Sequence, residues 1–109
     1  MVSDKTFKLV EGTPKEYTKI ADSGNPITSH FCGDCGSTLW RDGPSFPGEK
    51  VIKIGVVDDI EVIHTVTPAV ELFPHERASW QPKMEGTVQM PDMMPETIKK
   101  ARETVISRV

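Results

Sequence analysis

The residues most suited to chemistry are the two cysteines of the chain, Cys32 and Cys35, which form a Cys-x-x-Cys pattern. A glycine follows each cysteine and permits the backbone bends by which such a turn brings two thiolates to one point. This pattern is typical of one half of a tetrahedral zinc site. The candidate ligands for the other half within one chain are His30, Asp34, His64 and His75.

Several arrangements of the cysteine pair remain open on residue types. His30 and Cys32 are two residues apart on a predicted strand, so they would project from one face and could share a metal. Two copies of the chain would supply four thiolates and close a Cys₄ zinc site across a homodimer. Alternatively the pair is vestigial, its thiols are free or joined in a disulfide, and glycines and hairpin hydrogen bonds keep the turn. A thioredoxin-like redox pair fits less well, because its Cys-x-x-Cys opens a helix.

A second polar group follows a predicted strand near residue 71. His75 and Glu71 could share acid–base catalysis on a small molecule, while Arg77 binds an anionic group. The alternative is that Arg77 pairs with a carboxylate and braces its loop while Trp80 fills the core. Trp40 either packs beneath the cysteine turn or joins Tyr17 in lining a pocket for an aromatic ligand. The candidate residues are His30, Glu71 and His75 for catalysis and Trp40, Arg77 and Trp80 for substrate binding.

Apolar and β-branched runs predict the strands that position these residues. They span residues 7–10, 17–21, 27–31, 37–41, 51–57 and 69–73. Two of these strands flank the cysteines, which places the Cys-x-x-Cys at the tip of a hairpin. The Val51–Val57 segment is nearly all apolar, so we expect a central, buried strand.

The last part of the chain changes character. Residues 81–95 combine prolines and a glycine with four methionines, which predicts irregular chain that covers the sheet. From Pro95 onward apolar residues recur at spacings of three and four, which predicts a helix over residues 95–109. We therefore expect a single, mainly β domain over residues 1–109 that ends in this helix.

Composition limits the classes of function. The chain has 109 residues, is 37% hydrophobic and carries a net charge of −3, as expected for one small soluble domain. An acidic balance argues against a general nucleic-acid or membrane-surface role. The N-terminus predicts no signal peptide, and no window approaches the about 20 apolar residues of a membrane span. We expect a cytoplasmic protein with a small-molecule substrate and neither nucleic acid nor membrane as partner.

Several of these motifs together resemble one family. They are Ser23–Asn25, His30–Trp40, Val51–Asp59, Glu71–Phe73 and Arg77–Trp80. Over residues 5–82 this combination resembles the C-terminal portion of the GFA/CENP-V family, the glutathione-dependent formaldehyde-activating enzymes and their relatives. The resemblance implies an Mss4-like fold of small coiled β-sheets with a zinc-ribbon-type hairpin.

The resemblance also implies carbon–sulfur lyase activity and two zinc ions. In such a protein Cys32 and Cys35 would provide two ligands of a structural zinc, and the remaining zinc cysteines would lie upstream. No cysteine precedes Cys32, so the N-terminal zinc cysteines of the family are missing here. We expect either a fragment or a natural short form with another task.

Three functional hypotheses follow. The first is a GFA-like small-molecule enzyme of lyase or isomerase type, for which secondary metabolism is one setting, that uses acid–base side chains without the family's catalytic zinc. The second is a carbon–sulfur lyase acting with zinc on a glutathione–formaldehyde-type adduct, with ligands from a partner chain. The third is a non-catalytic, zinc-ribbon-like binding module. We also expect a homodimer, because a second copy would cover the edges that missing strands leave open.

Overall fold

The structure is a computed structural model that describes residues 1–92. These residues contain seven strands, one short α-helix and two 3₁₀ turns, so the prediction of a mainly β chain is confirmed. They group into two compact units that divide after Ile60. The helix predicted over residues 95–109 lies outside the described residues, and the single domain over residues 1–109 stays a prediction. No helix within residues 1–92 is long and apolar enough to cross a membrane.

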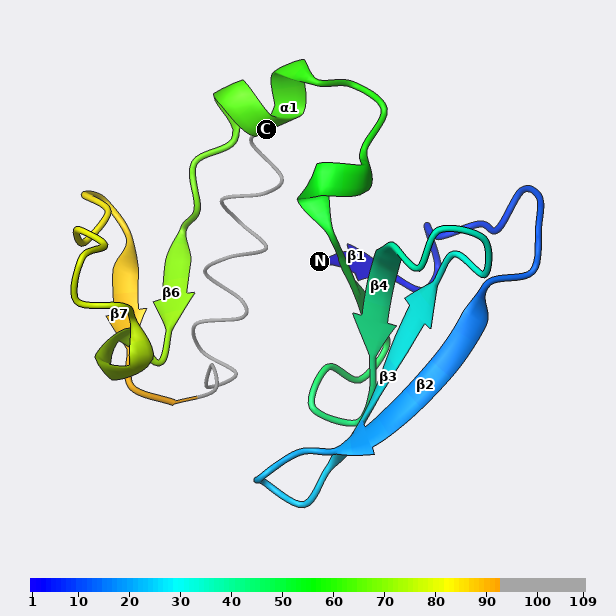
Figure 1. The fold of residues 1–109 in the computed structure, drawn as a ribbon, viewed down its shortest axis with the longest axis horizontal. Coiled ribbons are helices and arrows are strands. Elements are labelled where there is room, and N and C mark those ends of the chain that lie inside the picture. The colour runs from blue at the N-terminus through cyan, green and yellow to red at the C-terminus, as the bar shows by residue number, and fades with distance from the viewer. Residues whose placement is uncertain (93–109) are drawn as a thin grey trace. The chain divides into compact units, whose positions relative to one another are not determined.

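The first unit is built on a five-stranded sheet with the order β1-β5-β4-β3-β2. Its strands are β1 (Val2–Ser3), β2 (Lys15–Ile20), β3 (Pro26–Phe31), β4 (Thr38–Asp42) and β5 (Glu49–Ile52). All neighbouring strands are antiparallel, and Figure 1 shows β2, β3 and β4 side by side. Strand β2 forms one edge of the sheet, and all six of its residues are exposed.

The two cysteines lie in the turn between β3 and β4, as their flanking strands predict. The amide of Cys32 donates to the carbonyl of Ser37 at 2.9 Å, and the amide of Gly36 donates to the carbonyl of Cys32 at 2.8 Å. Gly36 has a φ of 77°, a left-handed conformation that glycine adopts without the cost a Cβ would impose. The turn is therefore held by backbone hydrogen bonds that need no metal.

The packing centre of the first unit is a single tryptophan. Trp40 is 8% exposed and is the only buried side chain in residues 1–92. Its ring stacks on His30 with a centroid distance of 4.5 Å, and Phe7 packs against it at 4.9 Å in a tilted arrangement. The indole Nε1 is buried and finds no hydrogen-bond partner among the described residues. Trp40 therefore serves the fold through its apolar surface.

Two strand predictions for the first unit are wrong. Residues 7–10 form no strand, because the N-terminal pairing is made by β1 and Phe7 instead packs on Trp40. The 51–57 segment is not a central buried strand: β5 ends at Ile52, and a 3₁₀ turn, η1 (Ile54–Val56), follows. The Lys53 amide makes the last ladder contact, at 3.0 Å to the carbonyl of Leu39, close to where β4 begins. β-branched residues stay in a strand only while a neighbouring strand pairs with them.

The second unit holds α1 (Glu61–Thr65), β6 (Val70–Leu72), η2 (Pro74–Glu76) and β7 (Val88–Met90). The strand predicted over residues 69–73 is confirmed as β6. Residues 81–95 are not wholly irregular, because β7 pairs with β6 in a parallel two-stranded sheet. The register sets Glu71 opposite Gln89, so these two residues are cross-strand neighbours.

Candidate functional site

The first sheet carries its polar side chains on two different faces, because side chains alternate along a strand. The cross-strand neighbours Glu16, His30 and Trp40 lie on one face. With Asp42 and Lys50 they form what we call the histidine face. The neighbours Tyr17, Ser29 and Arg41 lie on the opposite face, together with Lys19 and Ile27, and we call it the tyrosine face. Trp40 and Tyr17 are thus separated, so the predicted pocket shared by these two rings is wrong.

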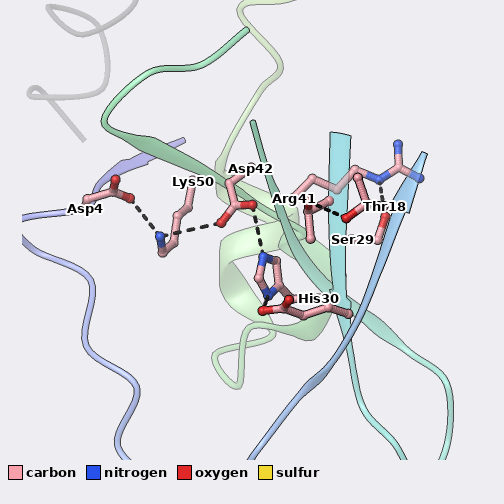
Figure 2. A network of polar contacts seen from close by, with 9 residues as sticks. Asp4, Thr18, Ser29, His30, Arg41, Asp42 and Lys50 are labelled. Atoms are coloured by element: carbon pink, nitrogen blue, oxygen red, sulfur yellow. Dashed lines mark hydrogen bonds and ion pairs between the residues drawn. The ribbon is translucent and has the colours of Figure 1, made fainter. Parts of the chain in front are cut away.

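His30 has a carboxylate at each ring nitrogen. Its Nε2 lies 3.0 Å from Asp42 Oδ1 and its Nδ1 lies 3.4 Å from Glu16 Oε1, and the side chain is 12% exposed. Asp42 continues to Lys50, whose Nζ is 3.7 Å from Oδ2, and Lys50 Nζ lies 2.9 Å from Asp4 Oδ1 (Figure 2). The hydrogen bond to Asp4 and attraction to Asp4 and Asp42 raise the pKa of Lys50, although burial opposes this.

This chain of contacts ties four strands and the N-terminal segment together. A general base needs a ring nitrogen that can reach a substrate proton. Both nitrogens of His30 instead face carboxylates, and one ring face stacks on Trp40. His30 would reach a substrate only after releasing Glu16 or Asp42. The geometry therefore favours a bracing role for His30 on the histidine face.

Glu71 forms the second charged cluster. Arg77 Nη1 donates to both carboxylate oxygens of Glu71 at 2.9 Å, and to Gln89 Oε1 at 3.3 Å. Gln89 Nε2 in turn donates to Glu71 Oε2 at 3.0 Å. Glu71 is 26% exposed and Arg77 25%, so water screens the pair only in part. The sequence alternative that Arg77 pairs with a carboxylate is thus what the structure contains.

A cavity of about 620 Å³ opens beside this cluster, within the second unit. Glu71 and Arg77 line it together with mainly apolar side chains, among them Pro68, Val70, Phe73, Pro82 and Met84. Small-molecule sites usually combine such an apolar lining of about 300–1,000 Å³ with a few polar groups that orient the ligand. Among the candidate residues, this cavity brings together Glu71 and Arg77.

The remaining candidates of the second unit lie elsewhere. His75 is exposed in η2, with Nε2 3.6 Å from Glu76 Oε1 and its ring in a T-shaped arrangement with Phe73, and it does not line the cavity. Trp80 is 80% exposed, so the expectation that it fills the core is wrong. It lies in a turn closed by the Gln81 amide, which donates to the carbonyl of Ala78 at 2.9 Å.

Sequence reasoning missed the partners that complete each cluster. The predicted strand over residues 37–41 stops short of Asp42, yet Asp42 ends β4 two residues after Trp40, and that spacing could have placed it beside His30. Gln89 offered no such signal, because a proline- and methionine-rich segment hid the short strand that carries it.

The cysteine turn presents two free thiols, Cys32 and Cys35. The pKa of the exposed Cys35 thiol is lowered, chiefly by hydrogen bonding with the side chain of Ser37, whose Oγ lies 3.3 Å from Sγ. No group of three or more histidine, cysteine or acidic residues in residues 1–92 could hold a metal. His30 faces Glu16 and Asp42 and is not directed to the cysteines. Within residues 1–92 of one chain, Cys32 and Cys35 therefore supply two of the four ligands that a zinc site needs, and the residues do not fit a complete site.

These features define a small, mainly β protein with a cysteine hairpin and a charged cavity. The family model described as glutathione-dependent formaldehyde-activating enzyme matches residues 1–76. The match covers most of the chain, which therefore belongs to this family, the GFA family, and the resemblance stated above is confirmed. No curated protein matches the chain, and no solved structure does so either. Glu71 and His75 fall inside the matched segment, whereas Arg77, Trp80 and Gln89 follow it.

Proposed function

We propose that the protein is a GFA-like enzyme acting on a small organic substrate, of lyase or isomerase type. Proton transfer is assigned to an acid–base side chain in the cavity of the second unit, with no catalytic zinc. Family membership supports the enzymatic class, since the family description names an enzyme. The observation that carries the proposal is the Glu71–Arg77 pair in the wall of a largely apolar cavity.

The pair suggests a division of labour. Arg77 uses one nitrogen, Nη1, for both oxygens of Glu71, so an anionic group of a substrate has the rest of the guanidinium to bind. Such a group competes with Glu71 for Arg77 and leaves a carboxylate oxygen to accept a proton. Gln89 keeps the carboxylate in place through its 3.0 Å hydrogen bond. His75 and His30 remain predicted acid–base residues outside this cavity, and Trp40 and Trp80 remain predicted substrate contacts outside it.

Turnover tests this proposal. Glutathione with formaldehyde is the first probe, followed by adducts of other thiols and aldehydes, with exchange measured by NMR. We expect turnover that survives a chelator and falls at least about 100-fold in Glu71→Gln, because a positioned acid–base group contributes about that much. Glu85→Gln, an exposed glutamate of the same unit outside the cavity, is the matched control. Chelator-sensitive turnover that persists in Glu71→Gln would contradict the proposal.

A zinc-dependent carbon–sulfur lyase is the second candidate, favoured by the two free thiols in the hairpin turn. Under this hypothesis Cys32 and Cys35 of two copies form a Cys₄ site of zinc-ribbon type and hold a homodimer. Zinc-bound dimers without turnover would instead indicate a binding module.

The zinc content of the purified protein and its oligomeric state in solution test this second candidate directly. Protein purified without added zinc should carry about 0.5 zinc per chain, one metal for two chains. Cys32→Ser should lose both zinc and the dimer, whereas Asp34→Asn should lose neither. If the purified protein were a metal-free monomer at dilute concentration, both the zinc site and the dimer would be ruled out.

A further inference from the structure

The tyrosine face carries a second, smaller cavity that no part of the proposed function uses. Its volume is about 330 Å³, and the side chains that line it belong to the first unit. Those that matter here are Tyr17, Lys19, Asp22, Ile27, Ser29 and Arg41. The histidine face lies on the other side of the same sheet, so this cavity is separate from the His30 contacts.

Two cations of this cavity lack an acidic partner among the described residues. Arg41 donates from Nε to Ser29 Oγ at 3.2 Å, a neutral acceptor, as Figure 2 shows. Neither Arg41 nor Lys19 forms an ion pair with a carboxylate of residues 1–92. Lys50 on the histidine face, by contrast, lies within 4 Å of both Asp4 and Asp42. The tyrosine face therefore keeps positive charge available to a ligand, although the whole chain is acidic.

The strand register places an aromatic ring on the same face as these cations. Tyr17, Ser29 and Arg41 form one row across β2, β3 and β4, and Lys19 pairs with Ile27 in the next row. Neighbouring positions in such rows lie about 5 Å apart, within reach of one small ligand. Tyr17 is 65% exposed on the edge strand, so its ring can be approached.

We infer that the tyrosine face binds a small aromatic carboxylate. The ligand ring packs against Tyr17 and Ile27, and its carboxylate lies between Arg41 and Lys19. The free guanidinium nitrogens of Arg41 suit the planar, two-oxygen geometry of a carboxylate. Asp22, which also lines the cavity, accepts a hydrogen bond from a hydroxyl or amino group on the ring.

Charge and size select this ligand class. Two cations and one carboxylate leave a formal charge of +1 in the cavity, which matches a monoanion better than a doubly charged phosphate. The volume lies at the lower end of the range of about 300–1,000 Å³ for ligand sites, which favours a single ring. Tyr17 adds a π-surface that an aliphatic acid could not use equally well.

The test follows the amide signals of the full ¹⁵N-labelled chain during titration with 4-hydroxybenzoate. We expect saturable shifts at Tyr17, Ser29 and Arg41. The methyl ester, which removes the charge and keeps the ring and its hydroxyl, should bind at least about tenfold more weakly, since hydrogen bonds to charged groups contribute about 1.5–3 kcal/mol. Inorganic phosphate should also bind more weakly, because it lacks the ring.

Variants locate the site. Arg41→Gln and Lys19→Gln should each weaken binding at least about fivefold. Lys8→Gln, an exposed lysine outside the cavity, and Glu71→Gln should leave it unchanged. The Lys19 side chain forms no hydrogen bond or ion pair within residues 1–92, and Lys19→Gln leaves the backbone pairing with Ile27 in place. Lys19→Gln therefore decides between the outcomes if Arg41→Gln disturbs the fold. Equal binding of the ester or of phosphate, or unchanged binding by Lys19→Gln, would overturn the inference.

Discussion

The charged clusters around His30 and Glu71 use the same kinds of contact but differ in what lies beside them. His30 is held between two carboxylates and stacked on Trp40, the one buried side chain in the described part of the chain. Glu71 is held by Arg77 and Gln89 but also lines a cavity. Both residues have chemically suitable side chains. A chemical role therefore requires, besides a suitable side chain, space through which a substrate can reach it.

The largest expected effect concerns the packing beneath His30. Trp40→Ala should lower the free energy of unfolding by about 3–5 kcal/mol, since it empties the packing centre of the first unit. Urea denaturation followed by circular dichroism measures this change. Trp40→Phe should retain most of the stability, because the indole Nε1 has no partner among the described residues. Trp80→Ala should change the free energy of unfolding by less than about 0.5 kcal/mol, because Trp80 is exposed. A larger loss would show that the Trp80 side chain makes stabilising contacts.

An intermediate effect is expected at His30 itself. His30→Gln should lower the free energy of unfolding by about 1–3 kcal/mol, because it removes the imidazole that contacts Oδ1 of the half-buried Asp42. The same denaturation experiment measures it, alongside turnover of the best substrate. If stability were unchanged but turnover fell more than about tenfold, His30 would take part in catalysis, and the distinction drawn between His30 and Glu71 would be wrong.

The smallest effect concerns the outer end of the histidine face. Asp4 and Asp42 raise the pKa of Lys50 above its ordinary value of 10.5, so the contact is fully stabilising below that pH. Its contribution is lost as the pH rises through the higher pKa of the folded state. Asp4→Asn should therefore reduce stability by about 0–1 kcal/mol at neutral pH and weaken the decline above pH 10.5. If the stability of both proteins declined identically at alkaline pH, the pKa of Lys50 would not depend on Asp4.

Local patterns predicted the elements that have strong local signals. Strands β2, β3, β4 and β6 and the cysteine turn follow from alternation, β-branched residues and glycines near the residues that carry them. Family membership follows from motifs of the same local kind. The predictions failed where a distant strand decides, as at Val51–Val57, where β5 ends after losing its partner, and at β7, which exists because β6 pairs with it.

The same division holds for the candidate sites. Residue types alone singled out Cys32, Cys35, His30 and Glu71, since the chemistry of a thiol, an imidazole or a carboxylate belongs to the side chain. Only the tertiary structure decided that His30 faces two carboxylates while Glu71 faces a cavity. It also separated Trp40 from Tyr17 and left Arg41 without an acidic partner in the described chain. Strand register determines these outcomes, because a shift of one residue moves a side chain to the opposite face of a sheet.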